Sequence, residues 1–411
     1  MEERAARVHK EAIIVDGHND IPSVMFATGV DLAARRAPTE LPRLHTDLAR
    51  MKAGGITGEF FSIYVDHRYA EKPTVRGGGS ARHALDLIDI VYQQVERHPD
   101  ALMIATRAED IRRAKREGKV ACLMGVEGGH AIENSLFALR TFHRLGVRYM
   151  TLTHTNTNEW ADSSGYGGVV VTRHHGLTPF GEKVVREMQR IGMLVDISHV
   201  SDETAAAVLK MAKAPVIASH SSARALAPHP RNLSDDLLRA LARNGGVAMV
   251  NFFSAFLDPK FAEAEERFAQ KYKKELAAIG PKYETKPLEA EREMIALREG
   301  AAFPVTPLSL LIDHIEHIIQ VAGIDHVGLG SDFDGVTALP AGIDGVDSLP
   351  KITLELLRRG HSEEDVRKVL GGNFLRAFEA AEAYAKGTNT TLSGDGDTTS
   401  IDSVSADAGT R

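Results

Sequence analysis

The sequence is poor in cysteine, since Cys122 is the single one among 411 residues. An intrachain disulfide therefore cannot form, and nothing requires an oxidising compartment. Long apolar runs are also missing: no stretch approaches the roughly 18 uninterrupted apolar residues that a membrane-spanning helix needs. The first residues, Met1 to Arg7, form a charged run with no apolar segment behind it, which predicts no secretory signal. We therefore expect a cytoplasmic globular protein without a membrane partner.

Positive charge is in short supply as well. The chain has 49 Lys and Arg residues against 56 Asp and Glu residues, and its net charge at pH 7 is −7. This balance argues against broad electrostatic binding to nucleic acid or to anionic lipid. Histidine, by contrast, occurs 18 times, and several of these residues stand at the ends of apolar runs. The histidines make metal chemistry the hypothesis to test.

Short β-type runs recur along the chain, each followed by a helix-like pattern. Most are near-continuous Val, Ile, Leu and Met stretches, as parallel strands covered on both faces require. The runs are 12–15, 59–65, 120–126, 148–153, 193–197, 215–219, 247–251 and 326–330. About eight βα units close a (β/α)8 TIM-like barrel of the α/β class, which is our predicted fold. An open doubly wound sheet is the rival, but no GxGxxG turn follows an early strand.

Two regions fall outside this rhythm. Residues 258–300 are highly charged and helical in pattern, and they predict a helical insertion before the last strand, overhanging the catalytic end of the barrel. Residues 387–411 are rich in Gly, Ser, Thr and Asp, with almost no large apolar residues, which predicts a disordered tail. We therefore expect a single barrel domain over residues 1–386, ending in C-terminal helices.

In such a barrel, reactive groups come from the C-terminal ends of different strands, so the residues after each apolar run are the candidates. His18 and Asp20 follow the first run. They are two residues apart, so both side chains point to one face of an extended backbone. Glu127 ends the third run, where a buried carboxylate is costly unless it is paired. Taken alone, the first pair also fits a polar turn, and Glu127 fits a helix cap.

The later runs end in the same way. His154 follows the fourth run, and His199 and His220 follow the fifth and sixth at a spacing of about one βα repeat. That spacing predicts equivalent positions on neighbouring strands. Asp332 and Asp334 follow the eighth run, and Asp332 is preferred as the working acid because it is nearer to the strand. An alternative for His154 is a purely structural role, as a histidine at a strand end whose ring nitrogens are hydrogen-bonded within the protein.

The combination is more informative than any single residue. Nitrogen and oxygen ligands without a thiolate suit Zn²⁺ or a similar borderline ion. Five such ligands are too many for one catalytic tetrahedral ion with an open position, so two ions sharing Glu127 fit the set better. A water held between two such ions loses a proton near neutral pH and becomes a nucleophile. The sequence therefore predicts a two-zinc hydrolytic site.

Several motifs of the chain resemble those of the membrane (renal) dipeptidase family, the zinc peptidases of family M19. The motifs are Asp16-Gly17-His18-Asn19-Asp20, Gly125-Val126-Glu127-Gly128-Gly129-His130, Leu152-Thr153-His154, Asp196-Ile197-Ser198-His199, Ala218-Ser219-His220-Ser221, Arg231-Asn232 and Asp332-Phe333-Asp334-Gly335. They occur in order between about residues 12 and 380. The HxD pattern, in place of the HxH of amidohydrolases, separates this family from its relatives.

The resemblance implies a role for each matching residue. One zinc would be held by His18 and Asp20 and the other by His199 and His220, with Glu127 bridging the two. By the same resemblance, His154 would contact the substrate and help to polarise the scissile carbonyl. Arg231 would bind the free α-carboxylate, for which a bidentate guanidinium is suited, although an arginine in a loop is most often merely solvated. Asp332 would contact the substrate, take a proton from the bridging water and later deliver it to the leaving amine.

The resemblance thus implies a zinc dipeptidase that hydrolyses free dipeptides, including L,D-dipeptides, with a hydroxide that bridges the metals. Similarity to the family also raises a homodimer as a hypothesis. Two alternatives stay open at this point. One is an amidohydrolase that acts on a non-peptide amide, lactam or ester, and the other is a non-enzymatic metal-binding scaffold.

Overall fold

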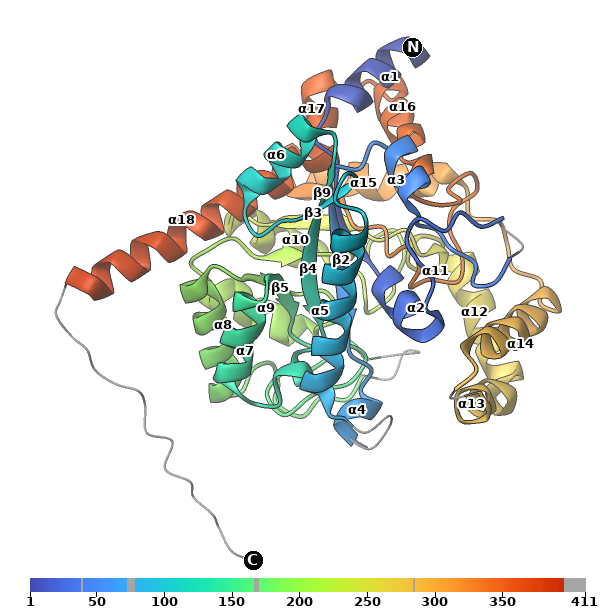
Figure 1. Cartoon of the computed structure of the whole chain (residues 1–411), viewed down its shortest axis with the longest axis horizontal. Coiled ribbons are helices and arrows are strands. Elements are labelled where there is room, and N and C mark those ends of the chain that lie inside the picture. Colours follow the sequence, from blue (N-terminus) through green and yellow to red (C-terminus); the bar gives the residue numbers. More distant parts are fainter. Residues whose placement is uncertain (38–39, 72–77, 166–169, 284, 395–411) are drawn as a thin grey trace, which may run out of the picture.

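The computed structural model describes residues 1–37, 40–71, 78–165, 170–283 and 285–394. Eight parallel strands close into a barrel, because β2 pairs with β4 on one side and β1 pairs with β9 on the other (Figure 1). The barrel strands are β1 (Val15–Asn19), β2 (Gly58–Tyr64), β4 (Val120–Glu127), β5 (Val147–Thr151), β6 (Leu194–Asp196), β7 (Ile217–Ala218), β8 (Val247–Val250) and β9 (Val327–Leu329). The predicted (β/α)8 barrel is confirmed.

Two details of the sheet differ from the sequence prediction. The first strand lies at Val15–Asn19 rather than at 12–15, because the polar residues that follow the apolar run are themselves buried and pair with β2. A ninth strand, β3 (Leu102–Ile104), pairs with the first half of β4. It was not predicted because the eight strands of the closed barrel already complete the βα count, and β3 lies outside that ring, paired with β4.

Helices follow the strands and cover the barrel. The first ten are α1 (Glu2–Glu11), α2 (Ile21–Thr28), α3 (Leu48–Ala53), α4 (Arg68–Glu71), α5 (Ser80–Arg97), α6 (Ala108–Glu117), α7 (Leu136–Arg144), α8 (Pro179–Ile191), α9 (Asp202–Met211) and α10 (Asp235–Arg243). The start of α9 is set by Ser201, and that of α10 by Ser234, whose side chains accept hydrogen bonds from the first helical turn. Among the described residues, no helix combines the length and the apolar character that crossing a membrane requires.

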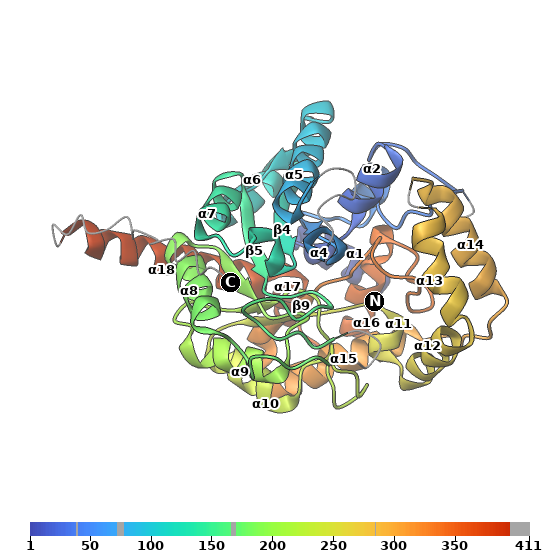
Figure 2. The ribbon, with the colours of Figure 1, turned by 90° about the horizontal axis from the view of Figure 1, so that it is seen from below.

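The predicted insertion is present between β8 and β9. The remaining helices are α11 (Ser254–Leu257), α12 (Pro259–Lys271), α13 (Lys273–Lys282), α14 (Pro287–Glu299), α15 (Leu308–Ala322), α16 (Pro350–Arg358), α17 (Glu363–Arg367) and α18 (Asn373–Gly394). Helices α12 to α14 form the insertion, which flanks the barrel beside α2 (Figure 2). The backbone N–H of Arg43 donates to Glu291 Oε1 at 2.8 Å and connects the insertion to the loop after α2.

The N-terminal end of the barrel is closed by α18. Phe374 packs edge-on against Phe60 from β2, with ring centroids 5.2 Å apart, in one apolar cluster with residues from several strands. Asn373 Nδ2 donates to Val327 O, at the start of β9. Helix α18 continues to Gly394, beyond residue 386 where the sequence analysis ended the folded domain. Residues 395–411, the rest of the predicted disordered tail, lie outside the described residues.

Candidate metal centre

The five predicted ligands lie together at the carboxyl ends of the strands. His18 Nε2 is 3.3 Å from Asp20 Oδ2 and 3.5 Å from Glu127 Oε2. The other oxygen, Glu127 Oε1, is 3.0 Å from His199 Nε2 and 3.3 Å from His220 Nε2. Glu127 therefore stands between two groups of donors and turns one oxygen toward each.

The site extends beyond these five side chains. Potential ligand atoms fall into three groups, each within 4.8 Å: His18, Glu127 and His220; Glu127, His154 and His199; His18, Asp20 and Asp332. The groups share members, so they form one continuous centre. Residue 335 must be glycine here, because a Cβ atom would lie 2.1 Å from Asp20 Oδ2 and 2.6 Å from Asp332 Oδ1. Gly335 therefore leaves room for the carboxylates of Asp20 and Asp332 to lie side by side.

His199 is held in an unusual backbone conformation. Its φ of 66° lies in the left-handed region, which a residue with a side chain seldom adopts. Its carbonyl oxygen accepts hydrogen bonds from Ser164 N at 2.8 Å, Thr153 Oγ1 at 2.9 Å and Ser163 Oγ at 3.1 Å. The loop after β5 therefore fixes His199 from the neighbouring strand. This support depends on contacts between two loops, which the spacing of residues in the sequence does not reveal.

His220 is oriented by a buried carboxylate that acts through a hydroxyl. Ser219 Oγ donates to Asp196 Oδ2 at 2.7 Å and lies 2.7 Å from His220 Nδ1. Because the hydroxyl proton is used toward Asp196, the ring must donate from Nδ1, and Nε2 keeps its lone pair. Asp196 also accepts from the backbone N–H groups of Ser198 and Ser219. Asp196 is the first residue of the motif that ends at His199, but residue spacing alone predicted no role for it.

The electrostatics of the centre favour metal binding. Burial lowers the pKa of both His199 and His220 well below the ordinary value, so both rings are neutral. Burial alone would raise the pKa of Glu127, but His18 and His154 hold it well below its usual range. Neutral imidazoles and an ionised carboxylate are the protonation states that metal ligands require.

The surroundings of His18 also favour a cation. Burial lowers its pKa, but Tyr149, Glu127 and Asp20 outweigh that effect and raise it well above the ordinary value. Its Nε2 atom is buried and has no hydrogen-bond partner among the described residues, although two carboxylates face it. Positive charge is favoured at this atom. An imidazole and carboxylate donor set without thiolate fits zinc or a similar ion, so the residues present fit the implied metal.

His154 and Arg231 lie at the edge of the centre. His154 Nε2 is 3.9 Å from Glu127 Oε1, and its ring packs edge-on against Tyr64. Arg231 is only 5% exposed. Its guanidinium donates to two neutral oxygens, His220 O at 3.0 Å and Ser221 Oγ at 3.3 Å, and its buried Nε has no described partner. A buried cation bonded in this way is suited to an incoming anion.

The two aspartates after β9 have different surroundings. Asp332 Oδ2 accepts from Asn251 Nδ2 at 2.8 Å, and burial, together with Asp20 and Glu127, raises the pKa of Asp332 to about 8. Asp334 instead accepts from the backbone N–H of His45 at 2.7 Å, while its own N–H donates to His45 Nδ1. The structure therefore places Asp332 at the centre and gives Asp334 a role in holding the loop around residue 45.

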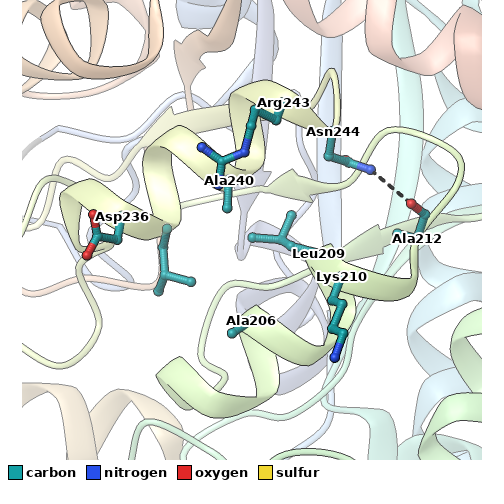
Figure 3. Close-up of a pocket in the computed structure, with 9 residues that line it drawn as sticks. Ala206, Leu209, Lys210, Ala212, Asp236, Ala240, Arg243 and Asn244 are labelled. Carbon is teal, nitrogen blue, oxygen red and sulfur yellow. Dashed lines mark hydrogen bonds between the residues drawn. The ribbon is translucent and has the colours of Figure 1, made fainter.

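A separate hollow lies away from this centre. A pocket of about 480 Å³ opens between α9 and α10 on the outside of the barrel (Figure 3). Its lining includes Leu209, Lys210, Asp236 and Arg243, and none of the predicted site residues takes part. It has no connection to the chemistry at the strand ends.

A parallel (β/α)8 barrel with histidines and carboxylates gathered at the strand ends defines the class of barrel metallohydrolases. A family model described as membrane dipeptidase (peptidase family M19) matches residues 2–392. The chain therefore belongs to the membrane dipeptidase family, and its class of activity is that of a metallo-dipeptidase. The resemblance inferred from the motifs is confirmed, and the amidohydrolase alternative is not favoured.

Solved structures agree with this assignment. The probable dipeptidase PvdM from Pseudomonas aeruginosa is 27% identical with a TM-score of 0.77, over 93% of this chain and 99% of that one. A metallopeptidase of family M19 named dipeptidase AC is 26% identical with a TM-score of 0.72, over 90% and 98% of the two chains. A metallopeptidase from Rhodobacter sphaeroides, liganded with a phosphinate mimic of L-Ala-D-Ala, is 25% identical with a TM-score of 0.70, over 90% and 100%.

Proposed function

We propose that the protein is a binuclear zinc dipeptidase that hydrolyses dipeptides with a free C-terminal carboxylate, including L,D-dipeptides. The observation that carries this proposal is Arg231, a buried guanidinium at the rim of the centre whose hydrogen bonds end on neutral oxygens. A buried charge without a direct salt bridge to a carboxylate of the described residues is costly, so a site that keeps one is suited to a charged ligand. The phosphinate dipeptide mimic in the Rhodobacter sphaeroides structure supports the L,D preference.

The ligand assignment follows from the two sides of Glu127. His18 and Asp20 would hold one zinc, His199 and His220 the other, and Glu127 would contact both. Zinc bound there supplies Lewis acidity toward a carbonyl and lowers the pKa of a water.

The remaining residues would bind and orient the dipeptide. Arg231 would hold the α-carboxylate, which places the scissile carbonyl next to His154 at the edge of the centre. Asp332 would transfer the proton that passes from the attacking water to the leaving amine. Asn251 occupies its Oδ2 atom and leaves Oδ1 to take a proton and deliver it to the leaving amine. A second carboxylate, Asp20, lies on the Oδ1 side.

The test compares L-Ala-D-Ala with its C-terminal amide, using the zinc-loaded wild type and Arg231→Met. We expect about two zinc ions per chain and cleavage of the free dipeptide. Loss of a charged hydrogen-bonded pair costs about 1.5–3 kcal/mol, so kcat/KM should fall about 10- to 150-fold when either the carboxylate or the guanidinium is removed. Removing both should cost little more than removing one.

The matched control is Arg239→Met, which removes an arginine from the outer surface of α10, where its side chain is 49% exposed. It should leave both substrates unaffected. Equal turnover of the free and amidated dipeptides by the wild type would contradict the role of Arg231. Metal-replete protein that cleaves neither substrate nor any other free dipeptide would contradict the proposed function.

A further inference from the structure

Tyr149 is a buried residue of the barrel interior to which no role has been assigned. It lies in β5 and is fully buried, and its ring packs against Phe60 with centroids 4.8 Å apart. The ring lies over Gly125, its partner in the register of β4 and β5. A Cβ atom at residue 125 would lie 2.0 Å from the Tyr149 Cζ atom, so only glycine leaves room for the ring.

The hydroxyl of Tyr149 ends beneath the metal centre, on His18. The oxygen lies 2.8 Å from His18 Nδ1 and donates its own proton to Gly17 O at 3.1 Å. Because a phenol has one proton and that proton is used toward Gly17, the oxygen must accept from His18. His18 therefore carries a proton on Nδ1, and Nε2, which faces Asp20 and Glu127, is the ring nitrogen that a metal ion would use.

We propose that Tyr149 is the positioning residue of the His18 side of the metal centre. It selects the ring tautomer and the ring angle that turn the Nε2 lone pair toward Asp20 and Glu127. A metal-binding histidine generally needs such an acceptor on its other nitrogen. This inference rests on the metal centre of the proposed function and adds a residue that neither contacts the substrate nor supplies a ligand.

The two sides of the centre differ in how they are supported. His220 is oriented by Ser219, its neighbour in the chain, which bonds to Asp196. His18 is oriented from β5, a strand that does not pair with β1. The phenol spans the inside of the barrel, so the angle of His18 depends on how the barrel core is packed. Loss of the Tyr149 hydroxyl should therefore affect one metal site and spare the other.

The experiment is a zinc titration of metal-free Tyr149→Phe in competition with a chromophoric chelator. The substitution keeps the ring over Gly125 and removes one oxygen. Loss of such a supporting hydrogen bond typically costs about 10- to 100-fold in metal affinity, so one of the two zinc sites should weaken by that factor while the other is unchanged. In a His18→Ala background, Tyr149→Phe should have no further effect on zinc affinity.

Ser219→Ala is the matched control, because it removes the hydroxyl that supports His220. It should weaken a zinc site in the wild type and also in the His18→Ala background. Unchanged affinity of both sites in Tyr149→Phe would overturn the inference. Equal weakening of both sites, with a lower melting temperature of the metal-free protein, would overturn it in favour of a packing role. A wild type that binds no zinc would overturn the proposed function as well.

Discussion

The two ends of the barrel are built by opposite rules. At the N-terminal end, Phe374 and Phe378 of α18 close the barrel against Phe60, and Asn373 satisfies the backbone at the start of β9. At the C-terminal end, the side chains are ionisable and buried, and atoms such as His18 Nε2 have no hydrogen-bond partner in the described part of the chain. The N-terminal end therefore supplies packing free energy, whereas the C-terminal end retains groups that are costly without a ligand.

Backbone strain follows the same division. Non-glycine residues with positive φ at the C-terminal end include His199, Asp332 and Asp334, with values of 63° to 66°. Such conformations cost of order 1–3 kcal/mol each and persist where the surroundings impose them. Here the three hydrogen bonds to the His199 carbonyl impose one of them. The difference teaches that substitutions at the two ends should separate activity from stability.

The largest effect on activity is expected for Glu127→Gln. The amide keeps the shape but removes the charge that faces both groups of donors, so zinc content should fall and kcat/KM should drop by about 10⁴-fold. The melting temperature of the chelator-treated protein should not fall, because no packing is lost. Atomic emission and thermal unfolding measure the two properties. Full zinc content in the variant would contradict the bridging assignment.

At the other end, Phe374→Ala should act on stability alone. Deleting a fully buried phenylalanine costs about 3–5 kcal/mol, and urea unfolding should show that loss while zinc per folded chain stays at the wild-type level. Phe137→Ala is the control, because that side chain is 63% exposed and its removal should cost less than about 1 kcal/mol. A selective loss of zinc in Phe374→Ala would break the division between the two ends.

The sequence predicts this division only in part. Glu127 and His220 could be identified because each follows an apolar run, and parallel strands bring their ends to one side. Asp196, Tyr149 and Asn251 could not be identified in this way. They act through contacts with residues far away in the chain, and one of them, Tyr149, reaches a strand that does not pair with its own. Spacing in a sequence carries no record of such contacts.

The errors of the fold prediction have physical causes of the same kind. The strand β3 pairs with β4 outside the closed barrel, so a pattern of eight βα units does not include it. The polar residues of β1 belong to the strand because Ser331, just after β9, hydrogen-bonds to Asp16, and Tyr149 of β5 hydrogen-bonds to His18. Hydrophobic runs therefore locate strands well where the core surrounds them and poorly where the site begins.

A smaller effect is expected on the pH dependence of stability through His314. This residue of α15 accepts from Ala223 N and bonds to Leu257 O, and burial lowers its pKa to about 4. The unfolded chain binds a proton near pH 6.5 and the folded chain does not, so this stabilising contribution is complete above pH 6.5 and is lost as the pH falls toward 4.

His314→Gln removes that titration and places at the position a neutral amide that can also donate and accept hydrogen bonds. Between pH 7.5 and pH 4.5, the free energy of unfolding of the metal-free wild type should fall by about 2 to 3 kcal/mol more than that of the variant. Urea unfolding at both pH values, with chelator present so that zinc does not contribute, measures the difference. Parallel pH profiles would show that folding does not lower the pKa of His314.

The smallest effect is expected in the outer pocket between α9 and α10, which belongs to neither end of the barrel (Figure 3). Lys210→Ala changes an exposed side chain on its wall and should alter the free energy of unfolding by less than about 0.5 kcal/mol. Because the pocket does not reach the strand ends, kcat/KM for L-Ala-D-Ala and the zinc content should also stay at the wild-type level. A clear loss of either would mean that the outer helices contribute to the chemistry, and the assignment of function to one end of the barrel would then be wrong.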